Sequence, residues 1–185
     1  MSTPSAPPCQ KPDLLLHVCC GPCATQVIEV LREDYRPVCF FYNPNIHPEE
    51  EFNARLEAVV KVARTSQVHL WVPPYRPEEW FQAIRGFEQE PEGGARCDLC
   101  YRLRLEETAK AAKATSTPQF TTTLTISPTK NSGRINRIGE EVSRRIGPAY
   151  QPHDFKKKNG FQQSVAKSRE LGLYRQKTCG CRFSR

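Results

Sequence analysis

Short, mostly apolar runs alternate with amphipathic segments along this chain. Successive apolar positions at residues 14–18, 38–42 and 68–72 are typical of strands buried on both faces of a sheet. A threonine-rich strand is predicted over residues 120–126 and a short final strand at Tyr150. Apolar residues spaced three or four apart predict helices over residues 24–33, 48–65, 78–85, 97–114, 134–146 and 162–171.

Strands that alternate with helices predict an α/β fold, with a mostly parallel, Rossmann-like sheet that carries helices on both faces. A length of 185 residues fits one domain, which we place at residues 13–185. We expect residues 1–12 to be a disordered tail, because the start of the chain is proline-rich and has no apolar run typical of a signal peptide or anchor.

No apolar stretch reaches the roughly 20 residues that a membrane-spanning helix needs. We therefore expect a soluble, cytoplasmic protein without a membrane partner. In such a reducing compartment thiols stay free, so that closely spaced cysteines favour metal binding over disulfides.

Positive charge gathers in the last third of the chain. Residues 130–185 hold 14 Lys and Arg against 4 Asp and Glu, a net charge of +10, whereas residues 1–129 hold 13 against 16, a net charge of −3. This asymmetry favours a polyanionic partner, nucleic acid first, only slightly over an ordinary solvated surface. Tyr150, Phe155 and Phe161 interleave with the charge and are candidates for stacking on unpaired bases, although core packing is favoured for Phe161.

Seven of the nine cysteines fall into three tight clusters. Several thiolates must surround a metal at once, and clustered thiols supply them. Cys39, in a predicted buried strand, and Cys9, in the tail, are interpreted as a core residue and an incidental one. The clustered cysteines are Cys19, Cys20, Cys23, Cys97, Cys100, Cys179 and Cys181.

The kind of metal stays open on spacing alone. The pair Cys97 and Cys100 at a helix start fits a redox dithiol, zinc or an iron–sulfur cluster, and the exposed amides there are expected to favour thiolates. A structural zinc site or a 4Fe-4S cluster takes four cysteines, so three remain for a second metal, a redox pair or a nucleophile.

The carboxyl ends of the predicted strands collect several unusual residues. In parallel sheets ligands bind beyond these ends. Asn43 follows the second strand, and Lys130 and Asn131 follow the threonine-rich strand. Asp154, the only acid between Glu141 and Glu170, is equally consistent with an iron ligand or proton donor and with a surface salt bridge.

Five motifs together resemble the QueH-type epoxyqueuosine reductases, over nearly the whole chain from residue 14 to 184. No single motif would suffice, but their order makes the resemblance specific. The motifs are HVCCGPC at 17–23, RCDLCYRLRL at 96–105, TISPTKN at 125–131, DFKK at 154–157 with Asn159-Gly160, and LYRQKTCGC at 173–181.

The resemblance implies an oxidoreductase of queuosine biosynthesis and tRNA processing, which reduces the epoxide of epoxyqueuosine in the tRNA anticodon loop without cobalamin. It also implies a fold like the adenine nucleotide alpha-hydrolase group, a 4Fe-4S cluster and a second iron nearby. The seven clustered cysteines match family ligands, and Asp154 matches a family acid. The division of the thiols between the two centres stays open.

Removing an epoxide oxygen as water takes two electrons and two protons, so we expect a tRNA with a queuosine-type anticodon and a reductant such as a ferredoxin or flavodoxin as partners. Asp154 or a nearby lysine is a candidate proton donor. The catalytic candidates are Cys23, Asp154 and Lys157. The candidates for binding substrate are Asn43, Lys130, Asn131, Lys156, Lys157 and Arg175.

Two other functions compete with this interpretation. An ATP-pyrophosphatase needs a loop of small residues after the first strand to cradle phosphate, and here three cysteines and a proline occupy that loop. A zinc-bound RNA-binding module without catalysis leaves the surplus thiols unexplained.

Overall fold

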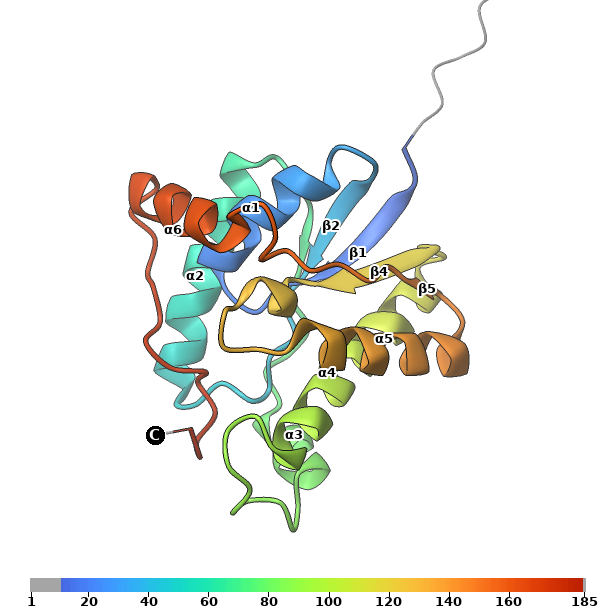
Figure 1. Ribbon diagram of the computed structural model, residues 1–185, viewed down its shortest axis with the longest axis vertical. Helices are drawn as coiled ribbons and strands as arrows, with labels where there is room; N and C mark the ends of the chain where they lie inside the picture. Colours follow the sequence, from blue (N-terminus) through green and yellow to red (C-terminus); the bar gives the residue numbers. More distant parts are fainter. Residues whose placement is uncertain (1–10, 185) are drawn as a thin grey trace, which may run out of the picture.

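Five parallel strands and the helices that cover them make up the computed structural model, which describes residues 11–184 (Figure 1). The strands are β1 (Asp13–His17), β2 (Arg36–Phe40), β3 (Leu70–Trp71), β4 (Gln119–Thr122) and β5 (Ala149–Tyr150). The helices are α1 (Gly21–Leu31), α2 (Glu49–Thr65), α3 (Pro77–Ala83), α4 (Ala95–Ala114), α5 (Ser132–Ile146) and α6 (Gly160–Glu170).

The strand order places a crevice at the centre of the sheet. The order is β3-β2-β1-β4-β5, and every neighbouring pair is parallel. The chain therefore builds outward from β1 through β2 to β3, then returns to the other side of β1 with β4. Loops that leave β1 and β4 diverge at this switch point, where open α/β sheets bind their ligands.

Alternate side chains of β1 fill two cores, one on each face of the sheet. Leu14 and Leu16 pack with apolar residues of α1 and α2, whereas Leu15 packs with apolar residues of α4 and α5. All three leucines are fully buried, as expected of a strand covered on both faces. The helix α6 packs against α1 and completes the first face.

The α/β fold with a mostly parallel sheet is confirmed, and the predicted helices and strands all occur with shifted ends. The threonine-rich strand is the exception, because it ends at Thr122 and continues as a 3₁₀ helix, η1 (Thr123–Ile126). The Thr122 hydroxyl accepts a hydrogen bond from the Leu124 amide at 3.1 Å and turns the chain out of the sheet.

The predicted disordered tail falls largely on residues that the structure does not describe; only Lys11 and Pro12 of it are described. Among residues 11–184, no helix combines the length and the apolar character that crossing a lipid bilayer requires.

Candidate metal centre

Three cysteines at the end of β1 bring their sulfur atoms together. The sulfurs of Cys19, Cys20 and Cys23 all lie within 4.8 Å of one another. We call them the thiol triad. Cys19 and Cys20 form the turn after β1, and Cys23 lies in the first turn of α1. Within residues 11–184, the triad is the only group of three or more potential ligands this close together.

Hydrogen bonds from η1 and from the segment that follows β2 fix the turn that carries the triad. The Thr123 hydroxyl accepts from the Cys19 amide at 3.2 Å and donates to the Cys19 sulfur at 3.4 Å. The Asn43 side-chain amide donates to the Val18 carbonyl at 2.8 Å. The triad is therefore held at the switch point between β1 and β4.

His17 supports the same edge of the sheet as a neutral ring. Burial, aided by the charge of Arg104, lowers the pKa of His17 to about 4. Its Nε2 donates to the Tyr42 carbonyl at 3.2 Å, so its Nδ1 accepts from the Thr122 hydroxyl at 2.8 Å. His17 thus links the ends of β1, β2 and β4, as a structural residue.

The three thiols of the triad differ in acidity. Hydrogen bonds with Cys20 and Cys23 hold the pKa of Cys19 well below its usual range. The contact with Cys19 raises the pKa of Cys20 to about 12, and contacts with Cys19 and Cys20 raise that of Cys23. The metal-free triad therefore favours one thiolate and two thiols, so that metal binding must release protons.

The other four clustered cysteines gather between α4 and the C-terminal segment. Cys100, Cys179 and Cys181 pack in one cluster with Trp80. Cys97 lies one turn before Cys100, and both are buried. We call these four cysteines the α4–tail group. The presence of Cys179 helps to raise the pKa of both Cys97 and Cys100, which indicates that the four thiols are near neighbours.

For the two cysteines at the start of α4, burial affects the pKa more than the exposed helix amides do. Desolvation raises the pKa of Cys97, and it raises that of Cys100 to about 11. The exposed amides at the helix start, which were expected to favour thiolates, are therefore outweighed by burial in the metal-free protein. One such amide does contribute, because the Gly93 N–H donates to the Cys97 sulfur at 3.2 Å.

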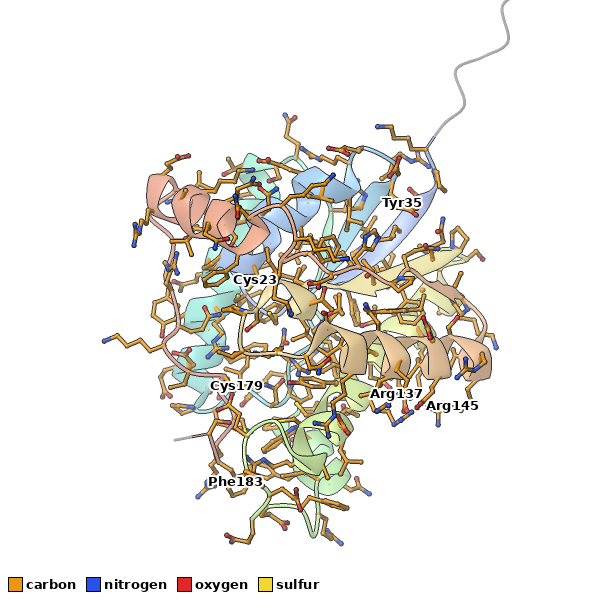
Figure 2. All side chains as sticks on the ribbon, in the orientation of Figure 1. Cys23, Tyr35, Arg137, Arg145, Cys179 and Phe183 are labelled. Atoms are coloured by element: carbon orange, nitrogen blue, oxygen red, sulfur yellow. The ribbon has the colours of Figure 1, made fainter. Side chains whose placement is uncertain are left out.

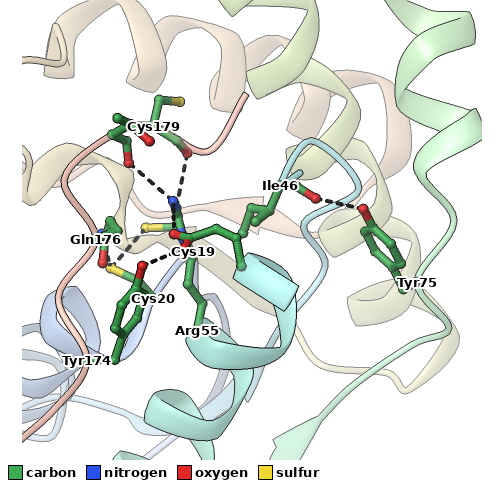
Figure 3. A network of polar contacts seen from close by, with 10 residues as sticks. Cys19, Cys20, Ile46, Arg55, Tyr75, Tyr174, Gln176 and Cys179 are labelled. Carbon is green, nitrogen blue, oxygen red and sulfur yellow. Dashed lines mark hydrogen bonds and ion pairs between the residues drawn. The ribbon is translucent and has the colours of Figure 1, made fainter. Parts of the chain in front are cut away.

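Arg55 of α2 holds the tail that carries Cys179 and Cys181 (Figure 3). Its guanidinium donates to the carbonyls of Thr178 at 3.2 Å and Cys179 at 3.0 Å, and it pairs with Glu51 at 2.6 Å. The His47 amide donates to the Gly180 carbonyl at 2.8 Å. Three successive carbonyls are thus fixed in a segment that has little apolar surface of its own.

A cavity of about 470 Å³ lies between the two thiol groups. Cys19, Cys23 and Cys179 line it, whereas Cys20, Cys97, Cys100 and Cys181 do not. Figure 2 labels Cys23 on α1 and Cys179 on the tail. Cys179 also belongs to the α4–tail group, so all three sequence clusters converge on this region.

Five buried polar atoms of residues along the cavity wall have no hydrogen-bond partner. They come from separate segments of the chain and all reach the same space. Buried polar groups are nearly always paired, so this set indicates a missing polar ligand. The atoms are Asn43 Oδ1, Asn45 Oδ1, Arg104 Nη2, Gln176 Oε1 and Ser184 Oγ.

Five basic side chains line the cavity, and two of them, Lys130 and Arg104, are influenced by its sulfurs. Burial acts to lower the pKa of Lys130, but the neighbouring sulfurs of Cys179, Cys19 and Cys23 raise it above its usual range. Arg104 is likewise charged despite complete burial. The positive charges of Lys130 and Arg104 therefore favour thiolates or an anionic ligand in the cavity.

The cavity wall includes only some of the predicted site residues outside the cysteines. Asn43, Lys130 and Arg175 line the cavity. Asn131 does not: it is exposed, and its side chain caps α5 by accepting from the Arg134 amide at 2.9 Å. Lys157 is exposed on the loop between β5 and α6. The roles predicted for these residues remain predictions.

Asp154 lies outside the cavity wall but is connected to it. The Asp154 carboxylate pairs with Lys156 at 3.7 Å, and Lys156 Nζ donates to the Lys130 carbonyl at 2.8 Å. Asp154 therefore stays a candidate both for a salt bridge, which it makes, and for a role at the site, because it lies beside a loop that lines the cavity.

Polar cavity residues outside the predicted set include Asn45, Arg55, Arg104 and Gln176. A sequence signal existed for Arg104, because it stands four residues after Cys100 and seven after Cys97 and so shares their helix face. Arg55 and Gln176 carried no comparable signal, since their roles depend on contacts between α2, the turn after β1 and the distant tail.

Comparison with known proteins places the chain in a family. A sequence model described as epoxyqueuosine reductase QueH matches residues 14–185. The epoxyqueuosine reductase QueH of Streptococcus pyogenes serotype M1 is 39% identical over 180 residues, 94% of this chain and 71% of that protein. The Thermotoga maritima protein of the same name is 38% identical over 175 residues, 92% of this chain and 89% of that protein.

The fold itself is shared more widely. The crystal structure of a predicted subunit of tRNA methyltransferase from Methanocaldococcus jannaschii resembles this chain with a TM-score of 0.55 at 12% identity, over 82% of this chain and 75% of that one. That likeness concerns the fold alone. The match over almost the whole sequence and the identities to its members show that this chain belongs to the epoxyqueuosine reductase QueH family.

Proposed function

We propose that the cavity between the thiol triad and the α4–tail group is the active site of this enzyme, an oxidoreductase that reduces epoxyqueuosine in the anticodon loop of tRNA to queuosine. One observation carries the proposal. Three sulfurs lie within 4.8 Å of one another, and two of their residues, Cys19 and Cys23, line a cavity that also includes Cys179 and several unpaired polar groups in its wall.

The donor set supports a 4Fe-4S cluster and an adjacent iron as resident cofactors. Thiolates suit iron–sulfur clusters, which take four cysteines each, and this region offers seven. When bound, the cluster would supply single electrons and the iron a Lewis acid at an open position. The proposed ligands are the triad, the α4–tail group and Asp154.

The reaction balances with two electrons and two protons per substrate. The epoxide oxygen leaves as water, and a carbon–carbon double bond remains between the two former epoxide carbons. A reduced protein of the ferredoxin or flavodoxin class supplies the electrons. Asp154 and Lys157 are proposed to deliver protons, because their loop is joined through Lys156 to Lys130 at the cavity. Cys23, which lines the cavity, remains the third catalytic candidate.

The cavity volume suits one extruded base. About 470 Å³ lies within the range of small-molecule sites, and enzymes that act on a base take it out of its stack. The unpaired oxygens of Asn43, Asn45 and Gln176 are placed to accept hydrogen bonds from substrate hydroxyl and amine groups. Lys130 and Arg175 offer positive charge to the flanking phosphates.

Anaerobic purification tests the cofactor and the activity together. The protein should hold about four or more irons with acid-labile sulfide per chain. With a chemical reductant and tRNA that contains epoxyqueuosine, nucleoside analysis should show queuosine. Stoichiometric zinc without sulfide would contradict the cofactor, and an intact cluster without queuosine formation would contradict the activity.

Cysteine variants test the ligand set. Cys97→Ala and Cys179→Ala should each lose the cluster, because either change removes a proposed thiolate ligand. Cys39→Ala is the matched control, since Cys39 is buried in β2 away from the cavity wall, and it should keep the cluster. A normal iron content in the first two variants would refute these ligands.

A further inference from the structure

Arg104 is a buried cation without an acidic partner. The residue is 2% exposed, in the interior of α4. Its Nε donates to the Cys100 carbonyl at 3.1 Å, and its guanidinium lies 5.6 Å from the centre of the Tyr101 ring. Its Nη2 has no hydrogen-bond partner. The ion pairs found among residues 11–184 do not include it.

Such a cation is costly in a protein interior. An uncompensated buried charge costs several kcal/mol, and proteins keep one only where a partner or ligand balances it. Arg104 lines the same cavity as Cys19, Cys23 and Cys179, and its Nε donates to the carbonyl of a fourth clustered cysteine, Cys100. The guanidinium therefore shares one cavity with cysteines of both thiol groups.

We propose that Arg104 is the fixed counter-charge of the inorganic centre and a positioning residue that raises its reduction potential. The inference rests on the proposed function, because it requires a redox centre held by these thiols. The free Nη2 group is the donor available for a sulfur or another anionic atom of that centre.

The direction of the effect follows from charge. Reduction by one electron adds a negative charge to a centre already surrounded by thiolates. A cation held nearby in a poorly solvated cavity stabilises the reduced form more than the oxidised form, which raises the potential. Net charge and hydrogen bonds to the sulfurs are the factors that set iron–sulfur potentials.

The test compares Arg104→Met with Arg102→Met in the iron-loaded, anaerobically purified protein. Arg102 lies on the same helix but pairs with Glu141 at the surface, at 2.6 Å, so it controls for loss of one arginine from α4. A titration with dithionite, followed by electron paramagnetic resonance, gives the midpoint potential. In R104M, the equilibrium constant for reduction should fall at least tenfold, about 59 mV for a one-electron couple; in R102M it should not change.

A second variant separates charge from shape. Arg104→Lys keeps the cation, so its potential should lie closer to that of the wild type than to that of R104M. A potential in R104K as low as that of R104M would overturn the counter-charge role. Weakened tRNA binding in R104M with an unchanged potential would also overturn it, because Arg104 would then be a substrate ligand.

Thermal unfolding of the metal-free proteins tests whether Arg104 has a purely structural role. Removing an unbalanced buried charge should leave apo R104M no less stable than the apo wild type. A large loss of apo stability would show that the guanidinium supports the fold and would contradict the inference. A wild-type protein without iron would instead refute the proposed function, whereas an iron-loaded R104M with a wild-type potential would refute only the role of Arg104.

Discussion

At the scale of single residues, environment separates cysteines that serve chemistry from one that serves packing. Cys39 in β2 is 1% exposed, and burial raises its pKa to about 12. Cys19, at the cavity, has a pKa well below its usual range. Because the thiolate is the reactive and metal-binding form, these two residues should differ sharply in reactivity.

Alkylation of the metal-free protein measures this difference. With iodoacetamide near pH 8 and mass-spectrometric peptide mapping, Cys19 should react at least tenfold faster than Cys39, which stays protonated and shielded. Denatured protein is the control, since both thiols should then react at similar rates. Equal rates in the folded protein would contradict the assignment of Cys39 to the core.

Cysteines could be predicted as site residues because their clustering is local in sequence. Arg104 could not, although its spacing from Cys97 and Cys100 puts it on their face of α4. Whether that face meets apolar core or a cavity depends on the tail with Cys179, which is held in place by contacts with distant residues such as Arg55 and His47. Such long-range contacts leave no pattern within one helix.

At the scale of elements, the close packing of α1 on α2 positions the triad. Gly21, between Cys20 and Cys23, lies so near Ala58 of α2 that a Cβ atom there would stand 2.8 Å from its backbone carbon. The backbone angle at Gly21 is not in the left-handed region, so the requirement for glycine is one of space.

Gly21→Ala should therefore force α1 away from α2. Overpacking of this kind costs about 1–3 kcal/mol, and because the shift moves Cys20 and Cys23, iron content should fall as well. Gly133→Ala in α5 is the control, because its Cβ would meet only Asn131 Oδ1 at 3.4 Å. Chemical denaturation and iron analysis check both; unchanged stability in G21A would show that the helices adjust without cost.

Element types and order followed from sequence periodicity, whereas the ends of elements depended on side-chain contacts. The buried strands and the long helices were predictable because their apolar spacing is strong. The turn from β4 into η1 was not, since four threonines in six residues suit a strand. The hydroxyls of Thr122 and Thr123 instead bond to Leu124 and Cys19, which favours a turn towards the site.

At the scale of the whole molecule, the basic last third divides into two surfaces. On α5, Arg134 pairs with Asp98 and Arg145 with Glu106, so much of this charge is balanced by α4. These two arginines therefore offer less free charge to phosphates than the count of basic residues suggests. Figure 2 shows Arg145 along α5, away from Cys23.

Free positive charge lies instead on the loop next to the cavity. Lys157 and Lys158 are exposed there, and no ion pair among residues 11–184 includes them. The same loop connects to the cavity through the contact between Lys156 and the Lys130 carbonyl. An anticodon loop that inserts one base into the cavity would bring its phosphates to these lysines.

The double variant Lys157→Ala/Lys158→Ala should therefore weaken tRNA binding. The plot of the logarithm of the binding constant against the logarithm of salt concentration should become shallower by about 1 to 2 units, roughly one unit per lost phosphate contact. The matched control, Lys110→Ala/Arg145→Ala, removes the same charge from residues paired with Glu107 and Glu106 and should keep the wild-type slope. Filter binding at several salt concentrations measures both. An equal loss of salt dependence in the control would contradict this prediction. Two lysines beside the cavity would then contribute no more to tRNA binding than two paired cations elsewhere, and net charge rather than this surface would govern binding.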